Sequence, residues 1–214
     1  MALRLADVSI AIEGTILIAP FSLEIAAGET LTLMGASGAG KSTLLSFIAG
    51  DLEAPFAAEG NVMLEGRRLD KCPPERRRIG RLFQDDLLFP HLTVAENLLF
   101  GMPRGPRSER LRKVEAALAE AELEGFADRP PHTLSGGQRA RVALMRALVA
   151  EPRAMLLDEP FNKLDSELRS AMRDFVFRHI AMRAIPCLMV THDLADVPEK
   201  GRVLLLKNAT VTHA

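Results

Sequence analysis

The segment Gly35-Ala36-Ser37-Gly38-Ala39-Gly40-Lys41-Ser42 combines residue types that suit phosphate binding. Glycines let a backbone curl so that several N–H groups point inward at phosphate oxygens. A helix that begins near Lys41 adds the positive end of its dipole. We predict that Lys41 binds the β- and γ-phosphates of a nucleotide and that the Ser42 hydroxyl binds Mg²⁺. The residues expected to line this phosphate site are Gly35, Ser37, Gly38, Ala39, Gly40, Lys41, Ser42 and Thr43.

An acidic pair stands at the end of a second apolar segment. Residues 154–157 are all apolar and predict a buried strand, which Asp158 and Glu159 follow directly. We predict that Asp158 binds Mg²⁺, either directly or through water. Glu159 is the candidate that polarises the water attacking the γ-phosphate. The alternative is a strand that simply ends in a polar turn.

A third candidate lies at the start of a predicted helix, in Leu134-Ser135-Gly136-Gly137-Gln138-Arg139. Ser135 suits the N-cap position, and the two glycines let a phosphate approach the first amides of the helix. A well-capped helix without a ligand explains the same residues equally well. The candidates for a second nucleotide contact are Ser135, Gly136, Gly137 and Gln138.

Elements that alternate between strand and helix must position these groups. A predicted strand, 30–34, leads into the glycine-rich loop, and a predicted helix, 41–49, follows it and ends at Gly50. This strand–loop–helix context distinguishes a P-loop from a glycine-rich turn. The other predicted strands are 3–12, 15–25, a hairpin over 61–69, 78–83, 154–157, 187–190 and 202–206.

Helical patterns dominate residues 93–150, with predicted helices at 108–123 and 138–150, and a further helix at 165–183. In the first of these, an apolar stripe recurs at helical spacing. The stripe consists of Leu111, Val114, Ala117, Leu118 and Ala121. We therefore expect a core of residues 1–84 and 151–214, interrupted by a mostly helical subdomain over 85–150.

Composition limits the classes of function. Among the 214 residues, 27 Lys and Arg balance 28 Asp and Glu, so no bulk charge favours nucleic acid or an anionic membrane. Solvated loop faces explain the basic runs 67–68 and 76–78 better than nucleic-acid contacts do. The chain has two cysteines, no pattern of a signal peptide, and no apolar run near the roughly 20 residues of a membrane helix. We expect a cytosolic protein that reaches any membrane process through a partner.

Taken in order, the motifs resemble those of the ATP-binding cassette (ABC) ATPases over nearly the whole chain. They are the P-loop, Gln84 in LFQDD, LSGGQR, LLDEP, Asn162-Lys163-Leu164-Asp165 and Thr191-His192-Asp193. The resemblance implies an α/β P-loop NTPase with a RecA-like core, an N-terminal antiparallel β region and an inserted helical subdomain. It also implies hydrolysis of ATP with Mg²⁺ in a homodimer. In that head-to-tail dimer, the P-loop of one copy faces residues 135–138 of the other across ATP.

The resemblance gives roles to three further residues. Gln84 matches the glutamine that contacts Mg²⁺ or the water and senses the membrane partner, with a polar loop residue as the alternative. His192 matches the histidine that contacts the γ-phosphate and holds the catalytic geometry. Asp165 matches an aspartate at the dimer seam, and an N-cap role is compatible with it. Gln84 and His192 thus join Lys41 and Glu159 in the expected catalytic set, and Gln84 joins Ser42 and Asp158 in the expected metal set.

The chain departs from the family pattern in two places. Ile12 stands where the family usually has an aromatic ring that stacks on adenine. Because base–aromatic stacking contributes about 1–3 kcal/mol, we expect weaker or less base-selective ATP binding unless another apolar residue substitutes. Asn162 and Lys163 replace small residues, a change that concerns communication between the two sites rather than hydrolysis.

The segment 87–100, LLFPHLTVAENLLF, resembles importer ATPases that work with a periplasmic binding protein. Through GASGAGKSTLL, LFQDDLLFPHLTVAENL and LSGGQRARVAL, the chain most closely resembles thiamine-type importer ATPases and a related bacterial group. In those proteins the segment lies where permease subunits dock; internal packing of the helical subdomain is an equal alternative. We expect an ATPase for small-solute uptake on the cytoplasmic face of the bacterial inner membrane. Permease subunits are the expected partners, and we expect no added C-terminal regulatory domain. An exporter or membrane-remodelling ATPase, or a non-transport ABC ATPase, is the alternative.

Overall fold

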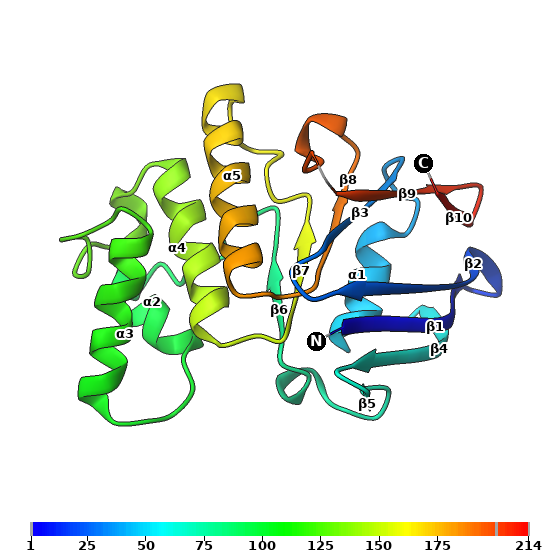
Figure 1. Cartoon of the computed structure of the whole chain (residues 1–214), viewed down its shortest axis with the longest axis horizontal. Coiled ribbons are helices and arrows are strands. Elements are labelled where there is room, and N and C mark those ends of the chain that lie inside the picture. The colour runs from blue at the N-terminus through cyan, green and yellow to red at the C-terminus, as the bar shows by residue number, and fades with distance from the viewer. Residues whose placement is uncertain (1, 200, 214) are drawn as a thin grey trace. The chain divides into compact units, whose positions relative to one another are not determined.

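The computed structural model describes residues 2–199 and 201–213. The chain forms two compact units, each with its own core (Figure 1). The first unit contains the residues up to 81, then 153–159, and the residues from 177 onward. The second contains 82–152 and 160–176. The chain therefore crosses between the units four times, and the last crossing falls inside a helix, α5 (Ser166–Met182).

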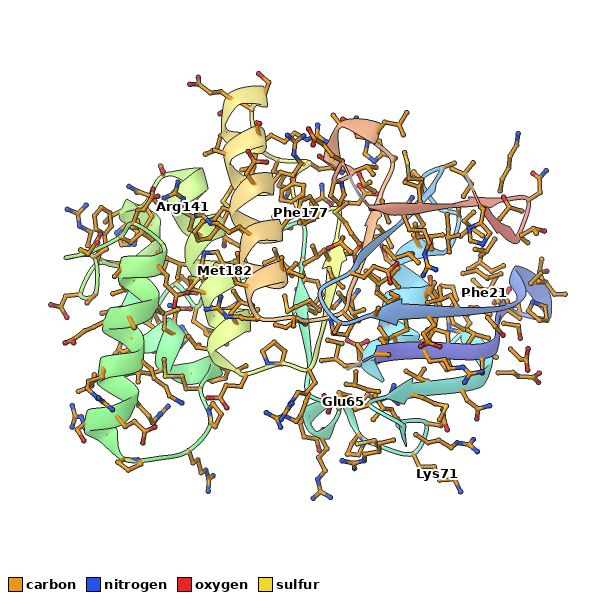
Figure 2. The ribbon with its side chains drawn as sticks, in the orientation of Figure 1. Phe21, Glu65, Lys71, Arg141, Phe177 and Met182 are labelled. Carbon is orange, nitrogen blue, oxygen red and sulfur yellow. The ribbon has the colours of Figure 1, made fainter. Side chains whose placement is uncertain are left out.

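The first unit begins with an antiparallel sheet of strand order β2-β1-β4-β5. Its strands are β1 (Ala2–Ile12), β2 (Thr15–Ala26), β4 (Phe56–Leu64) and β5 (Arg67–Arg68). The predicted turn at Glu13-Gly14 joins β1 to β2, and both of its residues have positive φ, as a tight hairpin requires. A second such turn, which includes Glu65, joins β4 to β5 (Figure 2). The predicted antiparallel β region is thus confirmed.

A second sheet, of strand order β10-β9-β3-β8-β7-β6, forms the rest of the first unit's framework. Its strands are β3 (Thr30–Gly35), β6 (Ile79–Leu82), β7 (Ala154–Asp158), β8 (Cys187–Thr191), β9 (Arg202–Lys207) and β10 (Thr210–His213). Strands β9, β3, β8 and β7 run parallel, and β10 runs antiparallel to β9. Parallel strands end at one common edge of a sheet, so the residues that follow β3, β7 and β8 lie at the same edge.

Burial explains why β7 and β8 carry almost no polar residues. Every residue of β8 is buried, and so are Ala154 to Leu157 of β7. A strand covered on both faces reads as a continuous apolar run, in contrast to the alternating pattern of β1. Strand β10 was not predicted, because it has only four residues, most of them exposed, and a single apolar residue, Val211.

Helix α1 (Lys41–Ala49) packs on this framework through Leu44, Leu45 and Ile48, which are fully buried. At its end, the Arg77 guanidinium donates to the carbonyl oxygens of Phe47 and Ile48 at 3.0 and 2.8 Å. Burial lowers the pKa of the Arg77 guanidinium below its ordinary value. The interpretation of the run 76–78 as a solvated loop face is therefore wrong for Arg77, which is 7% exposed and caps α1.

The second unit is helical. It contains α2 (Val94–Gly101), α3 (Arg107–Glu120), α4 (Gly136–Val149) and the first part of α5. The predicted stripe of α3 is buried at Val114, Ala117 and Leu118, whereas Leu111 is 39% exposed and does not belong to the core. Within this unit, the Arg141 guanidinium of α4 lies 5.3 Å from the centroid of the Phe175 ring. Short 3₁₀ turns complete the fold at Pro74–Arg76, Pro131–Thr133 and Leu194–Asp196.

Within the described ranges, 2–199 and 201–213, none of the helices has the length and apolar character that crossing a bilayer requires.

Candidate functional site

The glycine-rich loop runs from the end of β3 to the start of α1. Gly38 and Gly40 have φ of +77° and +95°, a backbone conformation that other residues adopt only with strain. A Cβ atom on Gly40 would lie 2.8 Å from the Leu17 side chain, and one on Gly35 would lie 2.7 Å from the carbonyl oxygen of Leu206. Both conformation and space therefore require glycine, and the loop curls as the sequence predicts.

Helix α1 presents its amino end to this loop. Its N-cap is Gly40, and no side chain caps the amides of the first turn. An uncapped helix start that follows a curled loop offers backbone N–H groups and a positive dipole end to an anion.

Lys41 adds a fixed positive charge on the same side. Its ammonium group donates to the carbonyl oxygens of Gly35 and Ala36 at 2.8 and 2.9 Å, and it lies 3.7 Å from Glu159 Oε1. The side chain is only 4% exposed. Lys41 thus reaches back over the loop, which places its charge where loop-bound phosphates would lie.

Ser42 and Asp158 meet although 116 positions separate them in the chain. The Ser42 hydroxyl donates to Asp158 Oδ1 at 2.8 Å. These two oxygens suit a small hard cation, since Mg²⁺ in nucleotide sites takes one or two protein oxygens and completes its shell with phosphates and water. Among the described residues, no cluster of three or more His, Cys, Asp or Glu is available to hold a metal. The donor set therefore fits Mg²⁺ held jointly with a nucleotide.

Glu159 follows β7 and has a φ of +46°, which is uncommon for a residue with a side chain. Its amide donates to the Val190 carbonyl oxygen at 3.0 Å, and its Oε2 lies 3.3 Å from His192 Nδ1. Left-handed backbone at a non-glycine residue costs on the order of 1 kcal/mol and recurs at functional sites. The conformation directs the carboxylate to a position between Lys41 and His192.

His192 is 55% exposed, so few contacts of its own side chain hold it. Hydrogen bonds of the neighbouring residues hold the loop that carries it. The buried Thr191 hydroxyl donates to Asp196 Oδ2 at 2.8 Å and accepts from the Asp193 amide at 3.1 Å. Asp196 is fully buried. The contact of Asp196 with Thr191 was not predicted. Its only signal in the sequence is a carboxylate three residues after Thr191-His192-Asp193.

A cavity of about 470 Å³ opens beside the loop. Phosphate-loop residues and Glu159 line one part of it, and Ile12, Leu17 and Phe56 line the other. Phe56 lies directly opposite Ile12 across the pairing of β4 with β1. The aromatic neighbour of Ile12 was not predicted, because it depends on the register of two strands that are distant in sequence.

In the first unit, Lys41, Ser42 and Glu159 thus line one cavity, and Asp158 and His192 contact two of these residues, Ser42 and Glu159. The remaining predicted site residues, Gln84, Ser135, Gly136, Gly137, Gln138 and Asp165, lie in the second unit.

The start of α4 carries a complete capping box. The Ser135 hydroxyl accepts from the Gln138 amide at 3.3 Å, and Gln138 Oε1 accepts from the Ser135 amide at 2.9 Å. The helix begins at Gly136, two residues before the predicted start. A Cβ atom on Gly137 would lie 2.5 Å from Leu168 Cδ1, whereas one on Gly136 would meet only Arg139 Nη2, at 4.0 Å. Gly137 is therefore needed for packing, and exposed Gly136 leaves the helix start accessible.

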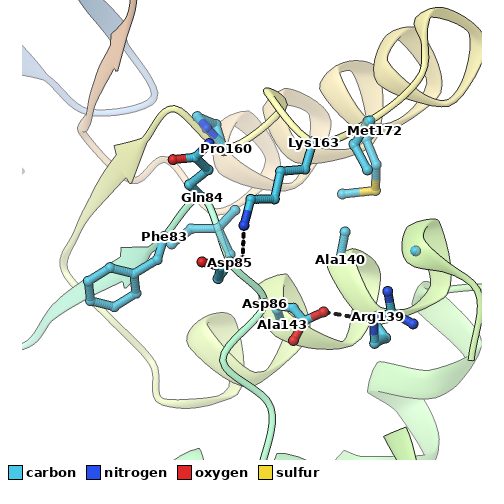
Figure 3. Close-up of a pocket in the computed structure, with 13 residues that line it drawn as sticks. Phe83, Gln84, Asp85, Asp86, Arg139, Ala140, Ala143, Pro160, Lys163 and Met172 are labelled. Atoms are coloured by element: carbon cyan, nitrogen blue, oxygen red, sulfur yellow. Dashed lines mark hydrogen bonds and ion pairs between the residues drawn. The ribbon is translucent and has the colours of Figure 1, made fainter. Parts of the chain in front are cut away.

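Gln84 is exposed and lines a cavity of about 140 Å³ within the second unit (Figure 3). On the same wall, Lys163 pairs with Asp85, and Arg139 pairs with Asp86 at 2.8 Å. Lys163, which with Asn162 forms one of the two departures from the family pattern, therefore has an ionic partner next to Gln84. Asp165 Oδ1 accepts from the Leu168 amide at 3.0 Å, so the expected N-cap role of Asp165 at α5 is confirmed.

The segment 87–100 divides between core and surface. Leu88, Val94 and Leu98 are buried, whereas Leu87 and Phe100 are 52% and 67% exposed. Buried Asn97 ties the loop before α2, because its side chain bonds both the amide and the carbonyl oxygen of Phe89. Internal packing thus accounts for the buried part of this segment, and docking of a permease on the exposed part stays a prediction.

Arg146 fixes the same segment from α4. It donates to the Leu87 carbonyl oxygen at 2.8 Å, and its guanidinium lies 5.5 Å from the Phe89 ring centroid. Burial lowers the pKa of this guanidinium, an effect that the Asp86 carboxylate opposes.

Comparisons with known proteins place these features in a family. Residues 18–162 match the ABC transporter family. The uncharacterized ABC transporter ATP-binding protein YnjD of Escherichia coli K12 is 46% identical over 199 residues, which cover 92% of each chain. The thiamine import ATP-binding protein ThiQ of Vibrio vulnificus is 46% identical over 178 residues, 82% of this chain and 75% of ThiQ. The spermidine/putrescine import ATP-binding protein PotA of Nitratidesulfovibrio vulgaris is 45% identical over 203 residues. That match covers 93% of this chain and 54% of PotA, so the chain spans little more than half of the polyamine relative.

This chain thus matches one family over most of its length. It also contains a phosphate loop with its lysine, a serine–aspartate pair, and a strand-end glutamate beside a histidine. The chain belongs to the ABC transporter ATP-binding proteins, and its fold is that of an α/β P-loop NTPase.

Proposed function

We propose that this chain is the ATP-hydrolysing subunit of a bacterial ABC importer for a small solute. The observation that supports hydrolysis most directly is the arrangement of Glu159, which lies 3.7 Å from Lys41 and 3.3 Å from His192 at the nucleotide cavity. The names of ThiQ and PotA support import rather than export. We propose a small organic solute such as thiamine, the solute in the name of ThiQ.

In the proposed reaction, water attacks the γ-phosphorus of ATP in line with the bond to the β-phosphate oxygen. Glu159 accepts a proton from the water as the new P–O bond forms, and ADP leaves with the bridging oxygen. Lys41 and the loop amides stabilise the charge on the phosphate oxygens. His192 orients Glu159 and contacts the γ-phosphate, and Gln84 contacts the metal or the water. Mg²⁺, held by Ser42 and Asp158, supplies further charge neutralisation when bound.

The second part of the proposal is a head-to-tail homodimer that completes the site. Exposed Ser135 and Gly136 at the amino end of α4 contact the ATP bound to the partner copy, together with Gln138. Support comes from the open space at Gly136, where a Cβ atom would have only Arg139 within 4 Å. An accessible helix start with small residues suits the approach of a phosphate. Asp165, exposed beside the start of α5, lies at the seam of this dimer.

Partners and location follow from the same function. We propose that membrane permease subunits dock on the exposed part of the segment 87–100, where Leu87 and Phe100 expose apolar surface. The residues 85–150 then act as the helical subdomain that transmits closure of the dimer to the permease. A periplasmic solute-binding protein takes part indirectly, and the subunit lies on the cytoplasmic face of the inner membrane. Near-neutral total charge supports the absence of nucleic acid among its partners.

The test of hydrolysis is release of phosphate from ATP by the purified chain, with Mg²⁺ and with EDTA. We expect turnover with Mg²⁺ and none above background with EDTA, because the metal neutralises charge on the phosphates. Co-expression with the permease subunits encoded beside it tests the transport role, since the complex should hydrolyse ATP faster when the loaded binding protein is added. An absence of Mg²⁺-dependent turnover both alone and in that complex would contradict the proposed function.

Phe56 should supply the contact with the base that Ile12 does not. We expect Phe56→Ala to weaken ATP binding about tenfold, because base–aromatic stacking contributes about 1–3 kcal/mol. Binding is measured by calorimetry on the full chain, with Phe56→Tyr as the variant that keeps the ring and should retain affinity. Inorganic triphosphate, which has no base, should bind equally to all three proteins. Equal ATP affinity of Phe56→Ala and the unchanged chain would exclude Phe56 from base recognition.

A further inference from the structure

Arg81 of β6 connects three separate elements of the first unit. Its Nη1 donates to Ser46 Oγ of α1 at 3.0 Å and to Asp51 Oδ2, in the segment after α1, at 3.3 Å. Its Nη2 donates to Asp158 Oδ2 at the end of β7 at 3.0 Å. The side chain is only 12% exposed. This burial and these three hydrogen-bond partners distinguish Arg81 from an arginine in an exposed surface ion pair.

The two oxygens of Asp158 are thereby divided between two partners. Oδ2 accepts from Arg81, and Oδ1 accepts from Ser42 at 2.8 Å. The outer torsion of an aspartate is broad and roughly two-fold, so an isolated carboxylate can exchange its oxygens. A guanidinium on one oxygen removes that freedom, because its planar fork holds acceptors in fixed directions. The oxygen that remains beside Ser42 is the one available to a cation.

The charges of the nearby acids favour the same placement of Arg81 beside Asp158. Asp158 and Glu159 are adjacent acids with 14% and 21% side-chain exposure, and Asp51 lies on the other side of Arg81. Partly buried carboxylates without a counter-charge are costly. Lys41 balances Glu159 at 3.7 Å, and Arg81 balances Asp158. The two adjacent acids thus face different cations, and Arg81 is shared between Asp158 and Asp51.

We propose that Arg81 is a positioning residue for the divalent metal: it holds Asp158 Oδ2 so that Oδ1 and Ser42 Oγ form one cation-binding edge. The proposal rests on the Mg²⁺-dependent function given above. The competing explanation is that Arg81 acts as a counter-charge only. A counter-charge close to the metal repels it, so the two explanations predict opposite effects when the arginine is removed.

The experiment measures how well the ADP-loaded chain retains Mn²⁺, by electron paramagnetic resonance of the free ion. We expect Arg81→Met and Arg81→Lys both to weaken Mn²⁺ binding about tenfold, since each loses a charge-assisted hydrogen bond that orients the carboxylate. Affinity for ADP in EDTA should stay within about twofold, because no phosphate contact is lost. Arg76→Met, which removes a charge from an exposed arginine of the same unit, should retain Mn²⁺ like the unchanged chain.

A second measurement separates positioning from a general loss of structure. In the Asp158→Asn background, Arg81→Lys should cause no further loss of Mn²⁺, because its effect passes through Asp158. If Arg81→Met folds poorly, Arg81→Lys remains available for the test, because it keeps the positive charge. Tighter or unchanged Mn²⁺ binding by Arg81→Met, normal binding by Arg81→Lys, or an equal further loss in the Asp158→Asn background would each overturn the proposal. Failure of the unchanged chain to retain Mn²⁺ with ADP would instead count against the proposed function.

Discussion

Replacing Glu159 by Gln should lower steady-state ATP turnover at least about a hundredfold while ATP binding is retained, because a general base contributes about 10²–10⁴-fold to the rate. Glutamine keeps the size of the side chain and its contact with His192, but it cannot accept a proton from the attacking water. The P-loop, Lys41 and the Ser42–Asp158 pair are unchanged. Phosphate release measures turnover, and calorimetry measures binding of ATP with Mg²⁺.

The matched control is Glu53→Gln, because Glu53 is an exposed glutamate of the same unit and does not line the nucleotide cavity. It should hydrolyse ATP like the unchanged chain. Light scattering of Glu159→Gln saturated with ATP and Mg²⁺ should also show a stable dimer, since closed dimers then cannot turn over. Rapid turnover by Glu159→Gln would remove Glu159 from its catalytic role, and persistent monomers would count against the shared site.

The second large effect concerns the start of α4. Gly136→Asp should lower turnover about a hundredfold, comparable to the loss of an anion-stabilising donor, because a carboxylate at this helix start repels phosphate. The position has space for a side chain and a normal backbone conformation, so the variant should fold. Gly105→Asp is the control: it introduces the same residue at another exposed glycine of the same unit, where a Cβ atom would have no neighbour within 4 Å. Its turnover should match that of the unchanged chain.

Mixing two inactive variants distinguishes a site within one chain from a site shared by two. Lys41→Ala disables the P-loop, and Gly136→Asp disables the helix start. In a head-to-tail dimer of one copy of each, one of the two sites keeps both intact parts, so random pairing should restore about a quarter of the turnover. A site built within one chain would give no recovery on mixing, and that result would contradict the composite site.

Much of the fold could be predicted because its signals are local. The burial of β7 and β8 follows from uninterrupted apolar runs, and the bounds of α1 follow from the glycines at each end. The capping boxes at Thr93 and Ser135 involve residues three positions apart. The errors arose where a signal was weak or depended on neighbours. Strand β10 has only four mostly exposed residues, and Leu111 fits the helical stripe but has no partner that covers it.

The sequence by itself determined the chemistry that is available: a P-loop with its lysine, a strand-end acid pair and a capped glycine start of α4. Each depends on residues within a few positions of one another, so spacing alone specifies it. The tertiary structure decided the pairings between distant segments: Ser42 with Asp158, Glu159 with His192, Phe56 opposite Ile12, and Arg81 with Asp158, the last separated by 77 positions. Phe56 meets Ile12 through the register of β4 on β1 in the antiparallel sheet. The other three pairings arise only when the distant strands β3, β6, β7 and β8 pack into one sheet and bring the residues near their ends together.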